Sequence, residues 1–592
     1  MAISEDKSAQ PDLLELQVDC LVALLQRCAA NDQRSFFSAA RSHSKLRDAA
    51  AQVLRMYTHS VTVALAPQQA ESQLDSVLLF LSNHSENIDS ISLKNPCRTS
   101  GSSLCSVVLA PTLMLTLREL PPSPQMHSLV LVGFDLQLQP SSSFPGVLTA
   151  SRAAALTQLQ LESCSLLDDD ADAALAAAVS QLPASLQRLS IKLYPSHGQR
   201  VHFGTGELQR LQQLTSLVLE GVVFQGPGDS PALQPLQGLT RLADLQLRVT
   251  RERSSITASM LSGMHNLTRL MVSGDLVRGA AGFEEVSPAV EAGALAGKTR
   301  MLHLDLGGCC LPGGAAGVAQ LLTNLQGMQH LTHLNLRSSP RGASVLLDMQ
   351  EGDPPATALA ALTASSKLQS LSISHCTLPA GTWQHLFPAG RQLPFLQSLN
   401  ISRVSQLGGS DATAPEASRL VSCCPSLQDL NMDELQCSAE PLTPLQGLSG
   451  LHTLHLLVSG PTAAEGLAAV CQLTGLKALS MCIQDVAEGL ALLQLTQLRQ
   501  LTELAVLRAA DGDKLYRSHG SLPMVSALLA VALCLLFAVT MGRYEQTGWH
   551  QSGPVSSSPT YHVKGACCNT QPESLMLLGN VNCEVGVYFC EL

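Results

Sequence analysis

Large apolar residues recur along most of the chain in the pattern L-x-x-L-x-L, whose last two apolar positions are two residues apart. Most copies begin about 24–31 residues after the one before, and this period is typical of a repeat array. Fifteen copies begin at Ile88, Met126, Leu156, Leu186, Leu214, Leu242, Leu267, Met301, Leu331, Leu368, Leu396, Leu427, Leu451, Leu476 and Leu501. A register kept over so many copies predicts an array of small stacked units rather than one large core.

Each copy predicts one short strand, because the L-x-L segment alternates between inward apolar side chains and an outward one. One repeat cannot bury its own leucines, so neighbouring strands are expected to stack. Between strands, residues 170–182 predict a helix with acidic residues in its first turn, and residues 235–242 predict a shorter helical piece. Insertions at 275–299, 338–360 and 405–418 are expected to be loops on one face of the array.

The repeats resemble leucine-rich repeats, and the resemblance covers residues 85–510. Several copies carry the family's downstream Asn/Cys position as Cys164, Cys309 and Cys376. Others depart from it there, with Val222, Ser339, Val404, Leu435 and Ser459. The resemblance implies an α/β solenoid of horseshoe form, with about fifteen repeats and short parallel strands on the concave face.

The middle residue of each L-x-L segment points outward and forms a row of small, mostly uncharged polar side chains. The candidate partner-binding residues on this concave face are Asp305, Asn335, Ser372, Asn400, Asn431 and His455. Such a row suits recognition of a protein or peptide by shape and hydrogen bonds. The alternative is that these side chains are solvated strand exteriors without a partner.

Residues 13–54 show two or three apolar helical faces. This stretch resembles an F-box, a helical module that docks on the S-phase-kinase-associated adaptor of cullin-RING ubiquitin ligases. The resemblance implies that the adaptor-binding residues are Leu16, Leu21, Leu24, Leu25 and Phe36. Three family signatures differ, since Gln17, Ala39-Ala40 and His43 stand where the family has Pro, Val-Cys and Trp. A helical cap over residues 1–60 that covers the first repeat is the alternative.

Residues 522–542 contain no charged side chain. A helix of this length, at about 1.5 Å per residue, is long enough to cross a hydrocarbon core of about 30 Å. Lys514 and Arg517 before the span favour a cytosolic position for the repeats. The stretch is therefore a candidate transmembrane helix, or else an apolar helix that covers the open end of the array. The tail, residues 543–592, is expected to be disordered.

Composition excludes several classes of protein. Charged residues make up 14%, aromatic residues 3% and hydrophobic residues 45% of the chain, whereas a disordered chain is charge-rich and poor in apolar residues. The net charge of −11, without a stripe of Lys and Arg, argues against nucleic-acid binding. The 18 cysteines form no CxxC pair, and the first residues lack the basic and apolar regions of a signal peptide, so we expect no such peptide and free thiols in the cytoplasm.

Two motifs resemble ligand sites, and neither has the context that the chemistry needs. Residues 292–299 resemble a phosphate loop, but an acidic stretch precedes them and a repeat strand follows. His303 and His333 occupy equivalent positions in neighbouring repeats, with Asp305 nearby, but a metal usually needs three or four ligands. No common hydrolase, zinc-protease or dinucleotide motif occurs. The sequence predicts a protein that is not an enzyme and has no cofactor or metal.

The sequence therefore predicts a non-catalytic interaction protein. The leading hypothesis is a substrate-recognition adaptor of an SCF-type (cullin-RING) ubiquitin ligase, in which the repeats select the protein to be ubiquitinated. A structural scaffold associated with the axoneme or cytoskeleton is one alternative. A membrane-tethered cytosolic recognition protein is another.

Overall fold

The computed structural model describes the repeat region with gaps. The described residues are 59–65, 74–75, 77–79, 81, 88–95, 114–116, 125–137, 155–166, 171–193, 201–225, 234–249, 255–274, 276–279, 282–285, 287–338, 347, 349, 355–406, 417–433, 442–458, 468–483, 495, 497–508 and 514–519. The F-box-like stretch with Leu16, Leu21, Leu24, Leu25 and Phe36, the apolar stretch 522–542 and the tail 543–592 lie outside these residues.

The chain divides into two compact units. Unit 1 comprises Met1–Met301 with Gly308–Pro312, and unit 2 comprises Leu302–Gly307 with Gly313–Leu592. In the described part of unit 1, parallel strands pair in chain order. They are β1 (His59–Ala64), β2 (Ile88–Lys94), β4 (Ser128–Val132), β6 (Gln158–Leu166), β7 (Arg188–Leu193), β9 (Ser216–Gln225), β10 (Asp244–Val249) and β12 (Arg269–Gly274).

Unit 2 contains a second ladder of parallel strands. They are β16 (His303–Asp305), β17 (His333–Asn335), β18 (Ser370–Ser372), β20 (Ser398–Asn400), β22 (Asp429–Met432), β23 (Thr453–Val458), β24 (Ala478–Ile483) and β25 (Glu503–Arg508). A further strand, β26 (Lys514–His519), pairs with β25 in the antiparallel direction.

The strand register confirms the repeats. Each predicted apolar position lies beside its equivalent in the next repeat, as Leu371 lies beside Leu399 and Leu399 beside Leu430. These three side chains are at most 1% exposed. Burial of a leucine side chain contributes about 1.5–3 kcal/mol, so the stacked rows of leucine supply the core of each unit. Each described ladder therefore resembles the stacked strands of leucine-rich repeats.

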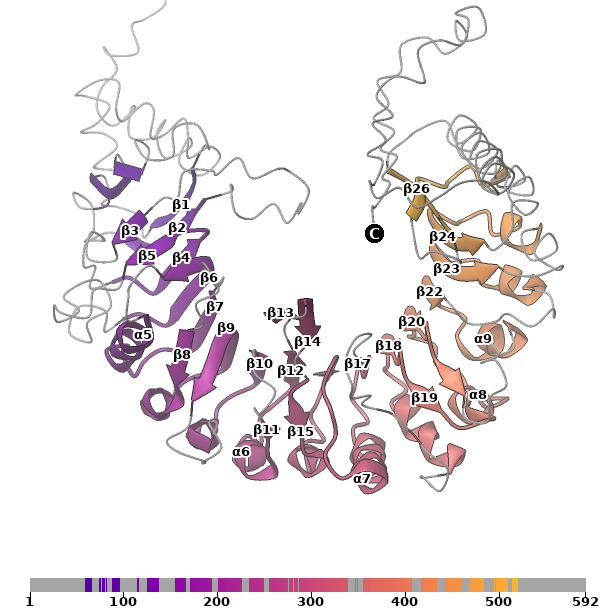
Figure 1. Ribbon diagram of the computed structural model, residues 1–592, viewed down its shortest axis with the longest axis horizontal. Coiled ribbons are helices and arrows are strands. Elements are labelled where there is room, and N and C mark those ends of the chain that lie inside the picture. The colour runs from indigo at the N-terminus through magenta and orange to yellow at the C-terminus, as the bar shows by residue number, and fades with distance from the viewer. Residues whose placement is uncertain are drawn as a thin grey trace, which may run out of the picture. The chain divides into compact units, whose positions relative to one another are not determined.

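Helical segments connect the strands within each unit. In unit 1 they include α5 (Ala171–Ser180), η6 (Thr205–Arg210), η7 (Gln234–Gly238), α6 (Ala258–Ser262) and η8 (Ala292–Leu295). In unit 2 they include α7 (Gly314–Gln326), η9 (Ala356–Thr363), α8 (Thr382–Leu386), α9 (Ala417–Cys423) and η10 (Thr443–Gly447). Figure 1 shows α7, α8 and α9 on the side of unit 2 away from the faces of β18 and β20. The helix predicted at 170–182 and the helical piece at 235–242 are confirmed.

Parts of all three insertions form helix or strand, and the expectation of plain loops is wrong there. Strands β13 (Leu276–Gly279) and β14 (Gly282–Glu285) form an antiparallel hairpin within the first insertion. In the second, η9 is helical because its sequence is rich in alanine, and Leu359 and Leu362 are buried. Hydrophobic burial therefore extends the repeat into segments whose composition is typical of loops.

A residue with positive φ bends the chain after the L-x-L segment in six described repeats; two of these residues lie inside β6 and β9, where the pairing register shifts. It stands two positions after the last apolar residue of the repeat pattern, and we call it the corner residue. The corner residues are Gly133, Ser163, Gly221, Gly308, His375 and Arg403. In unit 2, His375 separates β18 from β19 (Thr377–Leu378), and Arg403 separates β20 from β21 (Ser405–Gln406). Because β19 and β21 pair in parallel, the corner starts a second layer of strands.

The residue after the corner is a buried cysteine in three repeats. The Sγ atoms of Cys164, Cys309 and Cys376 lie 3.6, 3.2 and 3.5 Å from the carbonyl oxygens of Leu131, Val272 and Leu336, respectively. Each acceptor is the last apolar residue of the preceding repeat, so the thiol links consecutive repeats. The described cysteines are free thiols.

Basic side chains cap the helical segments of preceding repeats. Lys298 is 5% exposed, and its Nζ donates to the carbonyl oxygens of Leu261 at 2.5 Å and Met264 at 3.0 Å, at the end of α6. Arg210 donates in the same way to Leu182, just after α5. The lysine of segment 292–299 is thus held by backbone carbonyls, in agreement with its lack of a phosphate-loop context. Within the described residues, none of the helices has the length and hydrophobicity to cross a membrane.

Candidate protein-recognition surface

The six outward residues predicted as a partner-binding row lie on adjacent strands of unit 2. Strand register pairs Asp305 with Asn335, Asn335 with Ser372, Ser372 with Asn400, Asn400 with Asn431 and Asn431 with His455. All six are partly exposed. With adjacent strands about 4.8 Å apart, the row forms one continuous polar strip. We call it the polar row.

The acidic and amide side chains of the polar row also shape the backbone. Oδ1 of Asp305 accepts from the N–H of Gly307 at 2.9 Å, and Oδ1 of Asn335 accepts from the N–H of Arg337 at 3.1 Å. Equivalent bonds join Asn400 to Ser402 and Asn431 to Asp433, each at 3.1 Å. These four hydrogen bonds belong to one motif, in which the side-chain oxygen accepts from the backbone N–H two residues further along the chain. Part of the reason for Asn and Asp at these positions is therefore structural.

We call these hydrogen bonds the Asx contacts. They use the side-chain oxygen of each asparagine and leave its amide nitrogen facing outward. Nδ2 of Asn335 donates to Oδ1 of Asp305 at 2.9 Å. Among the described residues, the Nδ2 groups of Asn400 and Asn431 donate no hydrogen bond, although their oxygens are used. Because its oxygen is fixed, each amide is held in one orientation before any partner arrives. This lowers the entropy cost of binding an acceptor.

His455 lies at the acidic end of the polar row. Partial burial lowers the pKa of His455, and the nearby carboxylates of Asp433, Glu503 and Asp429 oppose this shift. The net direction is downward, so the neutral imidazole is the favoured form near pH 7. This side chain offers one donor and one acceptor rather than a charge.

His303 and His333 lie on adjacent strands, one position before Leu304 and Leu334. Their ring centroids are 5.0 Å apart, and their planes are inclined by 29°. Nδ1 of His333 lies 2.9 Å from the hydroxyl of Thr332. In the described part of the chain, no group of three or more His, Cys, Asp or Glu side chains could hold a metal ion. The pair is best described as stacked surface histidines.

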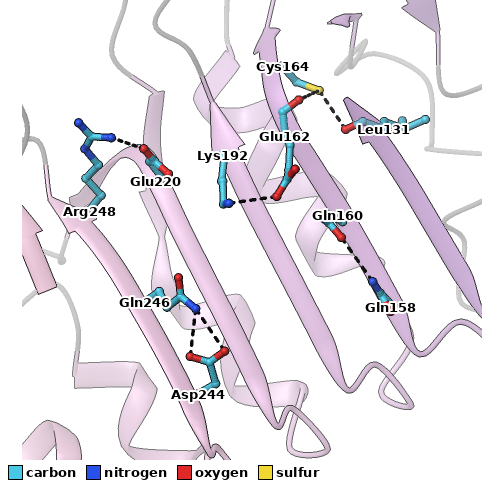
Figure 2. A network of polar contacts seen from close by, with 10 residues as sticks. All are labelled: Leu131, Gln158, Gln160, Glu162, Cys164, Lys192, Glu220, Asp244, Gln246 and Arg248. Carbon is cyan, nitrogen blue, oxygen red and sulfur yellow. Dashed lines mark hydrogen bonds and ion pairs between the residues drawn. The ribbon is translucent and has the colours of Figure 1, made fainter. Parts of the chain in front are cut away.

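The equivalent strand face of unit 1 is more highly charged, and two pairs of its charged side chains form ion pairs with each other. Glu162 accepts from Lys192 at 3.0 Å, and Arg248 pairs with Glu220, as Figure 2 shows. Partial burial raises the pKa of Glu162, but hydrogen bonds from Lys192 and Gln160 more than offset this, and the net shift is downward. Internal pairing leaves this face less able to bind a charged partner.

Three side chains next to the polar row, from two arginines and a histidine, were not among the sequence-predicted residues. Arg337, His375 and Arg403 follow β17, β18 and β20. The sequence held one signal for two of them, because three other repeats carry glycine at the corner position, namely Gly133, Gly221 and Gly308. The sequence pattern shows that His375 and Arg403 occupy this position, but it does not show that its φ is positive.

No protein-family model matches the chain, and no curated protein matches it. Among solved structures, an internalin of Listeria monocytogenes is similar at 19% sequence identity with a TM-score of 0.37. The match covers 63% of this chain and 85% of the internalin. At this level of similarity the internalin says nothing about what this chain binds.

Proposed function

We propose that the protein is a non-catalytic recognition module that binds a protein or peptide on the polar row of unit 2. The observation that carries this proposal is the unbroken register of Asp305, Asn335, Ser372, Asn400, Asn431 and His455 across neighbouring strands. Leucine-rich-repeat architecture provides the rigid backbone on which such a row is displayed.

Hydrogen bonding is the main contribution that this surface offers to a partner. The row supplies outward amide donors at Asn400 and Asn431, the hydroxyl of Ser372 and the imidazole of His455. A net contribution of about 0.5–1.5 kcal/mol per hydrogen bond would give a selective but moderate affinity. Apolar contacts with other parts of the partner would have to supply the remainder.

The test uses Ser372→Arg in the full-length chain, because Ser372 lies inside the row and takes no part in the Asx contacts. Proteins that the full-length chain captures are identified by mass spectrometry. Each is then purified and titrated against the variants by calorimetry. We expect Ser372→Arg to lower the affinity for a true partner by at least about tenfold, since a bulky side chain blocks the polar row. The matched control is Gln326→Arg, which adds the same side chain on exposed α7. Equal affinity for both variants would show that the row is not the binding surface.

We further propose that the module selects substrates for a cullin-RING ubiquitin ligase. This proposal rests on the F-box-like sequence of residues 13–54 alone. Full-length protein should retain the purified S-phase-kinase-associated adaptor, and Leu24→Asp should abolish retention, whereas Ser372→Arg should leave it intact. If the wild-type chain does not retain the adaptor, a scaffold function without ubiquitin chemistry takes its place.

A membrane tether is compatible with either function and rests on residues 522–542. Carbonate extraction of full-length protein, compared with a chain that ends at Arg508, tests it. Release of the full-length chain into the soluble fraction would contradict a transmembrane span.

A further inference from the structure

The ends of three neighbouring strands in unit 2 bring two arginines and a histidine together. Arg337 follows β17, His375 follows β18 and Arg403 follows β20. Backbone bonds connect these ends, because the N–H of Ser338 donates to Ser374 and the N–H of His375 donates to Ser402, each at 3.0 Å. Arg337 and Arg403 are exposed, and His375 is partly exposed. We call these three side chains the cationic cluster.

Two members of the cluster occupy a backbone conformation that favours glycine. φ is +60° at His375 and +55° at Arg403, whereas Gly133, Gly221 and Gly308 hold the same position in other repeats. A side chain at such φ costs roughly 1 kcal/mol relative to glycine. Ser163 shows that another side chain is tolerated at this position, but within the described part of the chain only His375 and Arg403 place two basic residues on neighbouring corners.

The two arginines lie close enough to His375 to influence its titration. Partial burial, and then the positive charges of Arg403 and Arg337, lower the pKa of His375 to about 4, so its imidazole is neutral near pH 7 and the charge of the cluster is that of the two guanidinium groups. Among the described residues, the guanidinium of Arg337 forms no ion pair. Positive charges gathered in this way favour a bound anion, on a chain whose net charge is −11.

Hydrogen-bond donors of the polar row border the cluster. The backbone N–H of Arg337 is fixed by Asn335, and the outward amides of Asn400 and Asn431 lie on the strands that end beside Arg403 and Asp433. The flanking repeats carry the carboxylates of Asp305 and Asp433, which bound the positive region on both sides. The region is therefore sized for a short acidic segment rather than for a long polyanion.

We propose that the guanidinium groups of Arg337 and Arg403, with the imidazole of His375 between them as a hydrogen-bond donor, bind an acidic segment of the protein partner, with its carboxylates at the cluster and its backbone carbonyls at Asn400 and Asn431. This inference rests on the proposed function of the polar row and assigns the chemistry of the partner. Guanidinium groups bind carboxylates through paired N–H donors, which gives orientation as well as attraction.

The experiment measures fluorescence anisotropy of a labelled peptide of alternating glutamate and serine with the full-length protein. A glutamine–serine peptide of the same length is the matched probe. We expect the glutamate peptide to bind, its affinity to fall as salt rises, and the glutamine peptide to bind at least about fivefold more weakly. The double variant His375→Gly/Arg403→Gly should reduce binding of the glutamate peptide by at least about fivefold.

These substitutions remove the charge of Arg403 and the imidazole of His375 while restoring the glycine that other corners use, so loss of binding cannot be attributed to a strained fold. Circular dichroism melts of each variant verify this. Arg188→Gln, which removes an exposed cation on β7 of unit 1, is the control and should leave binding unchanged. Arg337→Gln should weaken binding without a change at any corner.

Other outcomes would overturn the inference. Equal binding by the double variant, or equal binding of both peptides, would show that the cluster does not recognise carboxylates. If a single-stranded oligonucleotide displaces the labelled peptide at a lower concentration than the unlabelled glutamate peptide does, the cluster is a nucleic-acid site instead. If Ser372→Arg weakens binding of a captured partner while the double variant does not, the polar row remains a binding surface and the acidic-segment inference alone fails. If neither substitution changes the affinity for a partner, the proposed function and the acidic-segment inference both fail.

Discussion

At the scale of single residues, the corner residue shows how one backbone dihedral angle shapes a repeat. The chain must leave the exposed strand and start the second layer within about two residues. A positive φ does this, and only glycine adopts it without steric cost. Gly221 illustrates the tightest case, since an added Cβ would lie 1.9 Å from the carbonyl oxygen of Leu193.

Arg403→Gly is therefore expected to raise the free energy of unfolding by about 0.5–1 kcal/mol, through relief of steric strain at φ +55°. Gly221→Ala should lower it by about 3 kcal/mol, because the backbone of β7 must move. Urea denaturation at neutral pH measures both. A destabilised Arg403→Gly would indicate that contacts of the arginine side chain outweigh the strain.

His375 predicts a pH dependence of stability. Its pKa is about 4 in the folded protein, against an ordinary value of 6.5, mainly through burial and then through Arg403 and Arg337. Between these two values the unfolded state binds more protons, so stability falls as pH decreases from 6.5 to 4. His375→Asn should make this decrease shallower, because asparagine tolerates positive φ and does not titrate.

Urea midpoints measured at several pH values between 4 and 7, a window set by that shift, give the comparison. His455 has a pKa shifted in the same direction, so part of the acid sensitivity should remain in the variant. Parallel curves for the variant and the wild type would contradict the depressed pKa of His375.

At the scale of elements, the helical segments are short and are held by the next repeat rather than by their own length. Helices of one or two turns are marginal in isolation, and their last carbonyl groups lack intrahelical partners. Lys298 and Arg210 supply donors to such groups. A basic residue at the C-terminal end of a helix also interacts favourably with the helix dipole.

Lys298→Met should lower the free energy of unfolding by about 1–3 kcal/mol, because it leaves the carbonyl groups of Leu261 and Met264 without this donor. Lys477→Met, at an exposed position, is the matched control and should change stability by less than about 0.5 kcal/mol. Thermal and urea unfolding measure the difference. Equal stability of the two variants would mean that the free-energy cost of burying the Lys298 ammonium equals the stabilisation from its two hydrogen bonds.

At the scale of the whole molecule, stability comes from many equivalent layers of buried leucine in each unit, and the thiols lie within these layers. Burial raises the pKa of the Cys376 and Cys424 thiols to about 12. Because the thiolate is the reactive form, both should resist alkylation in the native protein at pH near 8.

Mass spectrometry after iodoacetamide treatment tests this protection cysteine by cysteine. We expect Cys376 and Cys424 to be labelled only in denaturant, whereas Cys310, which is less buried, should react earlier. Rapid native labelling of Cys376 would show that its repeat opens readily. The order of labelling also reports which repeats unfold together.

The sequence by itself determined the repeat, the strand positions and the outward row, because a two-residue alternation fixes which side chains are buried and one shift in register would expose the leucines. It also indicated that 292–299 and the two histidines lack the context of ligand sites. Only the tertiary structure decided the Asx role of the asparagines, the carbonyl partners of Lys298 and the cationic cluster. The physical reason is that these features depend on the sign of φ and on contacts between residues about 30 positions apart, such as Asp305 with Asn335. Local sequence patterns encode neither of these.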